Sequence, residues 1–86
     1  MTDYAITFAR SARRELEVLD ASVVRRVITK IETLAQIPRP SGSRKLQGEQ
    51  NLWRIRIGDY RIVYSVDDRQ RIVDIARIRH RRDVYR

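Results

Sequence analysis

LWRIRIGDYRIVY, residues 52–64, decides the fold and raises the main question about function. Bulky apolar residues alternate with polar ones on both sides of Gly58-Asp59. Alternation at period two is typical of a strand with one buried face. Glycine supplies the positive φ that tight hairpin turns require. The stretch therefore predicts two antiparallel strands, 52–57 and 60–66, joined by a short turn.

Alternation also assigns the side chains of this hairpin to two faces. One face carries the apolar set Trp53, Ile55, Ile57, Tyr60, Ile62, Tyr64 and Val66. The other face carries Arg54, Arg56 and Arg61. A solvated face needs polar residues but not three arginines, whose like charges repel one another. The pattern favours an anion-binding surface, and a merely solvated arginine-rich face is the alternative.

The remaining segments supply one more layer. Residues 4–8, YAITF, predict a short strand, and apolar residues at helical spacing follow over 8–19 and 23–35. We expect the second helix to end near Gln36, because Pro38 disfavours helical geometry at the residue before it. A loop over 38–51 and a further strand over 71–78, expected to lie inside the sheet, complete the chain.

The order strand, two helices and three strands predicts an α+β domain of two layers. We expect an antiparallel-type sheet of about four strands, with the N-terminal helical hairpin covering one face (β-α-α-β-β-β). The other face should stay open. Residues 1–86 form a single domain in this interpretation, since no repeat or low-complexity linker divides the chain.

Charge is distributed unevenly along the chain. The 86 residues carry a net charge of +8, and nearly all of the excess follows residue 38. Only Lys30 and Lys45 of the 19 basic residues are lysines. Arginine binds phosphate with two donors and stacks on bases, so the bias favours a phosphate-bearing partner. A genome rich in G and C also raises the arginine content, but it does not explain the asymmetry.

Other features indicate the compartment. The chain has no cysteine, which excludes disulfides and thiolate metal sites. No stretch approaches the roughly 20 apolar residues of a membrane helix. We therefore expect a cytoplasmic protein that does not contact membranes.

The C-terminal segment RHRRDVYR, residues 79–86, holds the candidates for proton transfer. His80, the only histidine, lies among cations that disfavour its protonation, which suits a general base. Tyr85 could serve as packing, as a stacking platform or as a proton donor. The sequence has no carboxylate cluster, no His/Cys metal spacing and no phosphate-binding glycine motif, so we expect neither a metal nor another cofactor.

Together these segments resemble the RelE/ParE superfamily of bacterial toxins from type II toxin–antitoxin systems. The resemblance rests on YAITF, PRPSGSRKLQG, WRIRIGDYRIVY and RHRRDVYR, in this order and spacing. It is nearest to the RelE branch, whose members are metal-free endoribonucleases that cut mRNA in the ribosomal A site. It implies an mRNA interferase that inhibits translation, held in a hetero-oligomer by a RelB-like antitoxin encoded next door.

The resemblance assigns roles to individual residues. Arg61 matches the arginine of the YR-x-x-Y pattern, and Arg81 and Tyr85 match an arginine and a tyrosine near the C-terminus. The catalytic candidates are Arg61, Arg81, Tyr85 and His80. The residues expected to bind RNA phosphate are Arg54, Arg56, Lys45, Arg82 and Arg79. The shorter spacing between Arg81 and Tyr85 leaves Arg82 or Arg79 as substitutes for Arg81.

Two other functions remain open from the sequence. ParE-like relatives share the fold but inhibit DNA gyrase without cutting RNA. An inactive remnant that only binds an antitoxin is the third interpretation.

Overall fold

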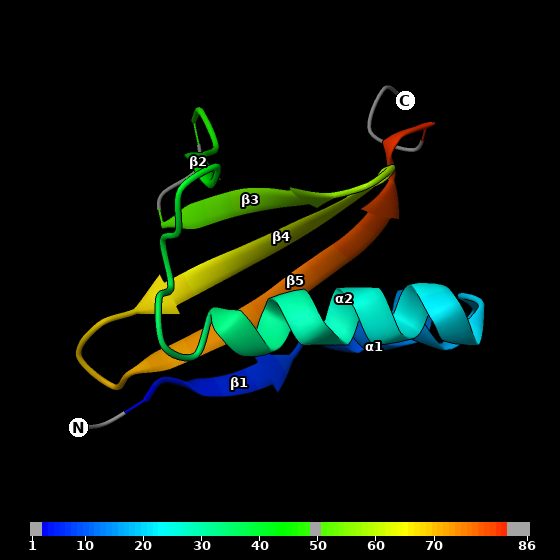
Figure 1. The fold of residues 1–86 in the computed structure, drawn as a ribbon. Coiled ribbons are helices and arrows are strands. Elements are labelled where there is room, and N and C mark those ends of the chain that lie inside the picture. Colours follow the sequence, from blue (N-terminus) through cyan, green and yellow to red (C-terminus); the bar gives the residue numbers. More distant parts are fainter. Residues whose placement is uncertain (1–2, 49–50, 83–86) are drawn as a thin grey trace.

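The fold places two helices against one mixed sheet (Figure 1). A computed structural model describes residues 3–48 and 51–82. The elements are β1 (Ala5–Phe8), α1 (Arg10–Glu17), α2 (Ala21–Thr33), β2 (Arg44–Lys45), β3 (Leu52–Ile57), β4 (Tyr60–Asp67) and β5 (Ile72–His80). The α+β class, the helical hairpin and the three C-terminal strands are confirmed.

The sheet differs from the expectation in two respects. Its order is β1-β5-β4-β3-β2, so the described residues form five strands and not about four. The additional strand, β2, consists of Arg44 and Lys45 within the predicted loop. In addition, β1 pairs in parallel with β5, while the other neighbours are antiparallel. Periodicity predicts a strand but not the direction of its partner, which explains the second difference.

The hairpin at the centre of the prediction forms as expected. Gly58 has φ 54°, and a Cβ at this position would lie 2.8 Å from Nη2 of Arg26. The positive φ is what favours glycine in this turn, since the Arg26 guanidinium is the end of a flexible side chain that can move aside. Strand β5 lies between β1 and β4, which confirms the prediction of an interior strand.

The core lies between the two helices and the apolar face of the sheet, with Ala12 of α1 fully buried in it. Val27, Ile31 and Leu34 from the second helical segment are buried. They pack with Ile55, Ile62, Tyr64, Val66, Val73, Ile75 and Ile78. Helix α2 ends at Thr33, three residues before Gln36, and a turn leads to Pro38. The hydroxyl of buried Tyr64 donates a hydrogen bond of 2.7 Å to the Pro38 carbonyl, which ties this turn to the sheet.

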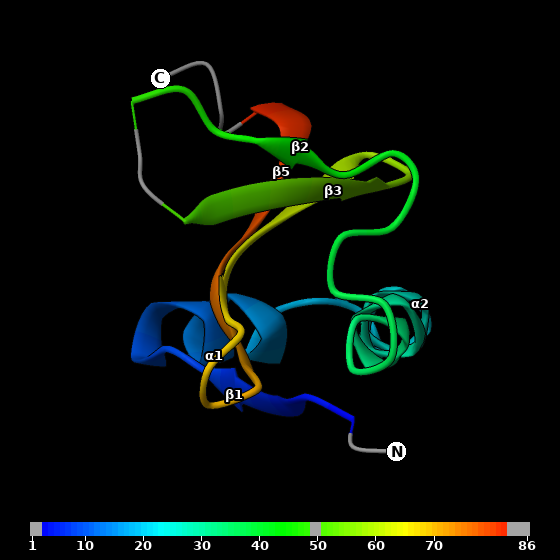
Figure 2. The same ribbon diagram turned by 90° about the vertical axis from the view of Figure 1, so that its left-hand side faces the viewer.

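Helix α1 occupies the edge of β5 that β1 leaves unpaired. The parallel pairing ends at Phe8, and the Ala9 amide donates to the Ile75 carbonyl at 2.8 Å. Farther along β5, Ser11 Oγ donates to the Ala76 carbonyl at 2.9 Å. Figure 2 shows α1 beside β1 and β5, with α2 farther away on the helix-covered side. The expected hairpin thus covers one face with α2 and closes a strand edge with α1.

A clasp of side chains joins three segments at the other end of the sheet. Arg39 donates to Asp68 through Nη2 at 2.8 Å and Nη1 at 3.2 Å. The Tyr4 hydroxyl donates to the same carboxylate at 2.6 Å. The Arg39 guanidinium also lies 5.2 Å from the Trp53 ring centroid. The clasp therefore links the start of β1, the segment after α2 and the β4–β5 turn.

This clasp predicts a specific pH dependence of stability. The hydrogen bonds from Arg39, and then from Tyr4, lower the pKa of Asp68 below its ordinary value of 3.8. A carboxyl whose pKa is lowered by folding stabilises the fold above its unfolded pKa, and that stabilisation disappears as pH falls through the folded pKa. We expect Asp68→Asn to lower the free energy of unfolding at pH 7 and to have no effect in the most acidic samples. Denaturant titrations from pH 7 to low pH measure this, and a difference that is constant with pH would contradict it.

Candidate functional site

Two rows of arginines cross the face of the sheet opposite α2. Residues directly opposite each other on neighbouring strands point to the same face. Arg56 of β3 lies opposite Arg61 of β4, which lies opposite Arg79 of β5. In the second row, Arg44 of β2 lies opposite Arg54 of β3. The predicted convergence of Arg54, Arg56 and Arg61 on one face therefore agrees with the observed register.

These arginines surround a hollow of about 380 Å³. Its lining comprises Gly42, Arg44, Arg54, Ile55, Arg56 and Arg61, with no carboxylate from the part of the chain that the structure describes. We call Arg44, Arg54, Arg56 and Arg61 the arginine surface. Its guanidinium groups come from three adjacent strands, and their mutual repulsion is relieved when an anion binds between them. The geometry suits phosphate, which accepts two hydrogen bonds from a single guanidinium.

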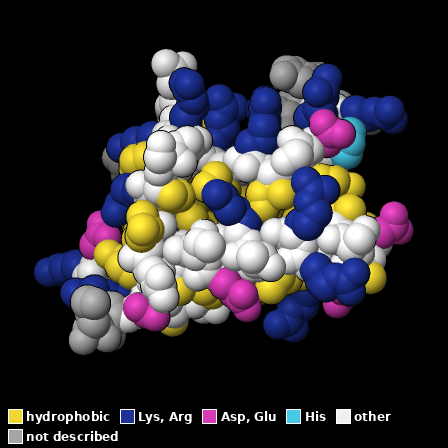
Figure 3. Space-filling view, in the orientation of Figure 1, with side chains coloured by type: hydrophobic (Ala, Val, Ile, Leu, Met, Phe, Trp, Pro, Cys, Tyr) yellow, Lys and Arg dark blue, Asp and Glu magenta, His cyan; other side chains and the backbone are white. Residues whose placement is uncertain are grey.

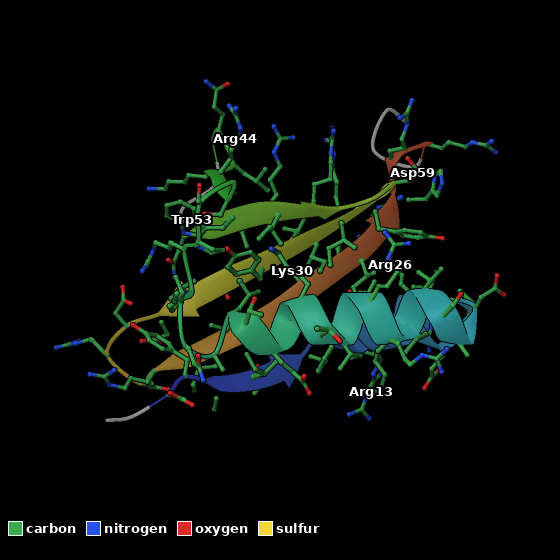
Figure 4. All side chains as sticks on the ribbon, in the orientation of Figure 1. Arg13, Arg26, Lys30, Arg44, Trp53 and Asp59 are labelled. Carbon is green, nitrogen blue, oxygen red and sulfur yellow. The ribbon has the colours of Figure 1, made fainter. Side chains whose placement is uncertain are left out.

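Sequence reasoning missed Arg44 and selected its neighbour. Arg44 lies opposite Arg54, whereas Lys45 lies opposite Trp53 and so on the other side of the edge strand. Figure 4 shows Arg44 standing above β3 at the β2 edge. Lys45 does line a second hollow of about 590 Å³ with Arg44, Leu46, Gln47 and Arg54. Only the register of the short β2 strand distinguishes the two positions.

The structure separates His80 from the arginine surface. His80 lies opposite Tyr60, whose side chain belongs to the apolar set of β4, and the two rings meet edge to face at 5.1 Å. Its Nδ1 accepts a hydrogen bond of 3.2 Å from the Arg82 backbone amide. By alternation, Arg79 and Arg61 point to the opposite face.

The segment after β5 meets the β3–β4 turn. The Arg81 amide donates to the Asp59 carbonyl at 2.7 Å, and Arg81 Nη1 lies 3.8 Å from Asp59 Oδ1. Both side chains are exposed, and Arg82 is exposed as well. Tyr85 lies outside the described residues. The structure thus brings Arg81 to the same end of the sheet as Arg56, Arg61 and Arg79, next to the turn that follows β3.

Another groove runs between α2 and β3 on the helix-covered side. Its volume is about 500 Å³, and mainly apolar atoms line it. The lining residues are Arg25, Arg26, Thr29, Lys30, Thr33, Arg56 and Ile57. Figure 4 shows Arg26 and Lys30 rising from α2 toward the strands, and Figure 3 shows an apolar band bordered by basic side chains on this face. Arg56 lines both this groove and the hollow of the arginine surface.

Two features are absent from the described residues, a metal-binding cluster and a membrane-spanning helix. Over 3–48 and 51–82, no group of three or more His, Asp or Glu side chains could hold a metal ion. Within the same ranges, no helix is long and apolar enough to cross a membrane.

The whole chain can be compared with known proteins. A model of the family described as "ParE toxin of type II toxin-antitoxin system, parDE" matches residues 6–85. This chain belongs to that toxin family. The toxin is 31% identical to Toxin RelG of Mycobacterium tuberculosis over 84 residues, 96% of this chain and 97% of RelG. The expected membership of the RelE/ParE superfamily is thereby confirmed.

Solved structures of RelE–RelB complexes share the fold of this toxin. A chain of the archaeal RelE–RelB complex from Pyrococcus horikoshii OT3 is 29% identical, with a TM-score of 0.81 over 94% of this toxin and 97% of that chain. A chain of the toxin–antitoxin complex RelBE2 from M. tuberculosis is also 29% identical, with a TM-score of 0.82 over 93% of both chains.

Proposed function

We propose that this toxin is an endoribonuclease that cuts mRNA at the ribosomal A site and so inhibits translation and growth. The observation that carries the proposal is the hollow of about 380 Å³ lined by Arg44, Arg54, Arg56 and Arg61. A group of cations whose described lining holds no carboxylate fits the phosphodiester of a nucleic acid. The likeness to RelG and to RelE structures supports the RelE branch.

The arginine surface can supply one part of RNA cleavage. Attack by the 2′-hydroxyl on the adjacent phosphorus places additional negative charge on the phosphoryl oxygens. Guanidinium groups fixed beside those oxygens stabilise this charge. Arginine is a poor proton acceptor because its pKa exceeds about 12, so other groups must move the protons. In this proposal Arg61 and Arg81 stabilise charge and Tyr85 takes the main share of proton transfer. His80 is the weaker candidate, because the register places its ring beside Tyr60 and not with Arg61.

We expect cleavage to depend on the ribosome. The described lining of the arginine surface consists of four arginines, Gly42 and Ile55, and it holds no aromatic ring on which a base could stack. Orientation of the reacting groups contributes a large part of the barrier reduction in enzymes. We therefore propose that the ribosome holds the mRNA in the reactive conformation.

Phosphate binding by Arg44 is testable with purified toxin. Each phosphate contact contributes about −0.7 to the slope of log K against log salt for single strands. We expect Arg44→Gln to reduce the slope for a uridine oligonucleotide by about this amount, because Arg44 lines the hollow. Arg13→Gln, which removes an exposed arginine from α1, is the matched control and should leave the slope unchanged. If Arg44→Gln and the unaltered toxin had equal slopes of log K against log salt, Arg44 would not be a phosphate-binding residue.

An antitoxin is the expected partner. The RelE–RelB complexes show that relatives of this toxin assemble with RelB. The groove between α2 and β3 combines an apolar lining with Arg25, Arg26 and Lys30 at its border. This combination fits an acidic amphipathic segment, and we propose that a RelB-like antitoxin encoded next door binds and inhibits the toxin in a cytoplasmic hetero-oligomer. Co-purification of the toxin with the product of the adjacent reading frame tests the pairing.

Inhibition of DNA gyrase is the second candidate function. The matching family model is described as ParE toxin, and the ParE-like branch is the gyrase-inhibiting alternative that the sequence leaves open. Brief induction of the toxin followed by primer extension on mRNA separates the candidates. Cuts within codons support the endoribonuclease, whereas intact mRNA with altered plasmid supercoiling supports the gyrase inhibitor. Absence of growth arrest in a host without the antitoxin would indicate an inactive remnant.

A further inference from the structure

Both rows of arginines reach β5 near a single carboxylate. Arg79 ends the row that begins at Arg56. The other row continues from Arg54 through Val63 to Arg77. Glu15, on the α1 helix that closes the β5 edge, meets both arginines of β5.

The contacts of Glu15 occupy both of its carboxylate oxygens. Arg77 donates to Oε2 through Nη2 at 2.8 Å and through Nε at 3.1 Å. Arg79 Nε lies 4.0 Å from the same oxygen. The other oxygen, Oε1, accepts the backbone amide of Ile78 at 2.7 Å. Glu15 is 24% exposed, so this carboxylate is partly shielded from water and fixed to the strand edge.

These contacts distinguish Arg77 from the arginines of the hollow. Two of its donors face Glu15, and hydrogen bonding to that carboxylate raises the pKa of Arg77. A phosphate that used these two donors would have to displace Glu15, and any phosphate approaching Arg77 would meet the negative charge of Glu15. Among residues 3–48 and 51–82, no carboxylate lines the hollow formed by Arg44, Arg54, Arg56 and Arg61. Along β5 the basic face therefore reaches an arginine, Arg77, whose charge Glu15 neutralises.

We propose that Glu15 is a built-in counter-ion that ends the phosphate-binding face at β5. It directs a single RNA strand to the hollow and excludes Arg77 from phosphate contact. Glu15 acts in this way through Arg77, so it is a positioning residue. This inference rests on the proposed RNA-binding function and adds a boundary to that site. Its direct consequence is that loss of the Glu15 charge increases the number of phosphates the toxin contacts.

The test is RNA binding by the full-length toxin as a function of salt. Glu15→Gln keeps a side-chain oxygen for the Ile78 amide but removes the charge that holds Arg77. With a uridine oligonucleotide as the probe, we expect its slope of log K against log salt to steepen by about 0.7, the value of one phosphate contact. Glu17→Gln removes the same charge from an exposed position of α1 and should leave the slope unchanged.

A double-substitution cycle identifies Arg77 as the responsible group. Arg77→Gln alone should leave the slope of the unaltered toxin unchanged, because Arg77 is paired with Glu15. The combined variant E15Q/R77Q should lose the additional slope of E15Q. If E15Q does not fold, as judged by thermal unfolding, R77Q decides alone. A slope reduced by about 0.7 in R77Q would show that Arg77 already contacts phosphate and would overturn the proposal.

The outcomes separate this inference from the proposed function. Binding by the unaltered toxin with equal slopes in E15Q overturns the counter-ion role and leaves RNA binding intact. Absence of RNA binding in every variant overturns the proposed function and the counter-ion role together. A steeper slope in E15Q that persists in E15Q/R77Q assigns the new contact to a group other than Arg77 and also overturns the proposal.

Discussion

Replacement of Arg61 by alanine is expected to reduce mRNA cleavage by about 10²- to 10³-fold, the usual cost of losing one group that stabilises developing charge. Arg61 lies between Arg56 and Arg79 in the register and lines the hollow. Its loss removes a cation from the centre of the row, where a scissile phosphate would lie near the largest number of arginines. Growth arrest after induction should disappear with the cleavage.

The fold should survive this substitution, because Arg61 points away from the core packed by α2. Thermal unfolding of purified Arg61→Ala checks this point, and Arg13→Ala provides a control for the loss of one exposed arginine. Arg81→Ala is expected to change toxicity in the same direction as Arg61→Ala. Full toxicity of both Arg61→Ala and Arg81→Ala would contradict the assignment of charge stabilisation to these residues.

Replacement of Tyr85 by phenylalanine is expected to reduce cleavage by about 10²- to 10⁴-fold, the range for loss of a general acid or base. Phenylalanine keeps the ring and removes only the hydroxyl, so packing and stacking remain. RNA affinity should therefore change little while the single-turnover rate falls. The measurement is single-turnover cleavage on programmed ribosomes at saturating toxin.

The comparison with His80→Gln separates the two proton-transfer candidates. We expect His80→Gln to lose less activity than Tyr85→Phe, because the His80 ring packs against Tyr60 and points away from Arg61. A larger loss for His80→Gln would transfer the main proton-transfer role to His80. A Tyr85→Phe variant as active as the unaltered toxin would limit Tyr85 to packing or stacking.

Alternation in the central hairpin was sufficient to predict its two faces. Within β3, Ile55 is buried and Arg56 is exposed, and within β4, Ile62 and Tyr64 are buried, as period two requires. The β2 strand could not be predicted, because two residues cannot display a period. The parallel partner of β1 could not be predicted either, because pairing with β5 is a long-range contact that leaves no mark on YAITF.

The candidate site was predictable where it lies on one hairpin. Arg54, Arg56 and Arg61 share a face by local alternation alone. Arg44 joins them only through the β2–β3 register. The pairing of β4 with β5 shifts between Val63 and Tyr64, so that Val63 lies opposite Arg77 while Tyr64 lies opposite Ile75. Simple alternation along β5 therefore does not predict the face to which Arg77 points. Glu15 is far from the hairpin in sequence. It meets Arg77 only because α1 lies along the edge of β5, which is a long-range contact.

The central claim is that the arginine surface serves to cut mRNA on the ribosome. The most direct measurement is incubation of purified toxin with ribosomes stalled on a defined mRNA, followed by primer extension, with Arg61→Ala in parallel. The account predicts a cut within the A-site codon by the unaltered toxin, a cut reduced by about 10²-fold or more with Arg61→Ala, and little cleavage of the same mRNA without ribosomes. Intact mRNA under these conditions, together with inhibition of gyrase supercoiling by the same toxin preparation, would contradict it.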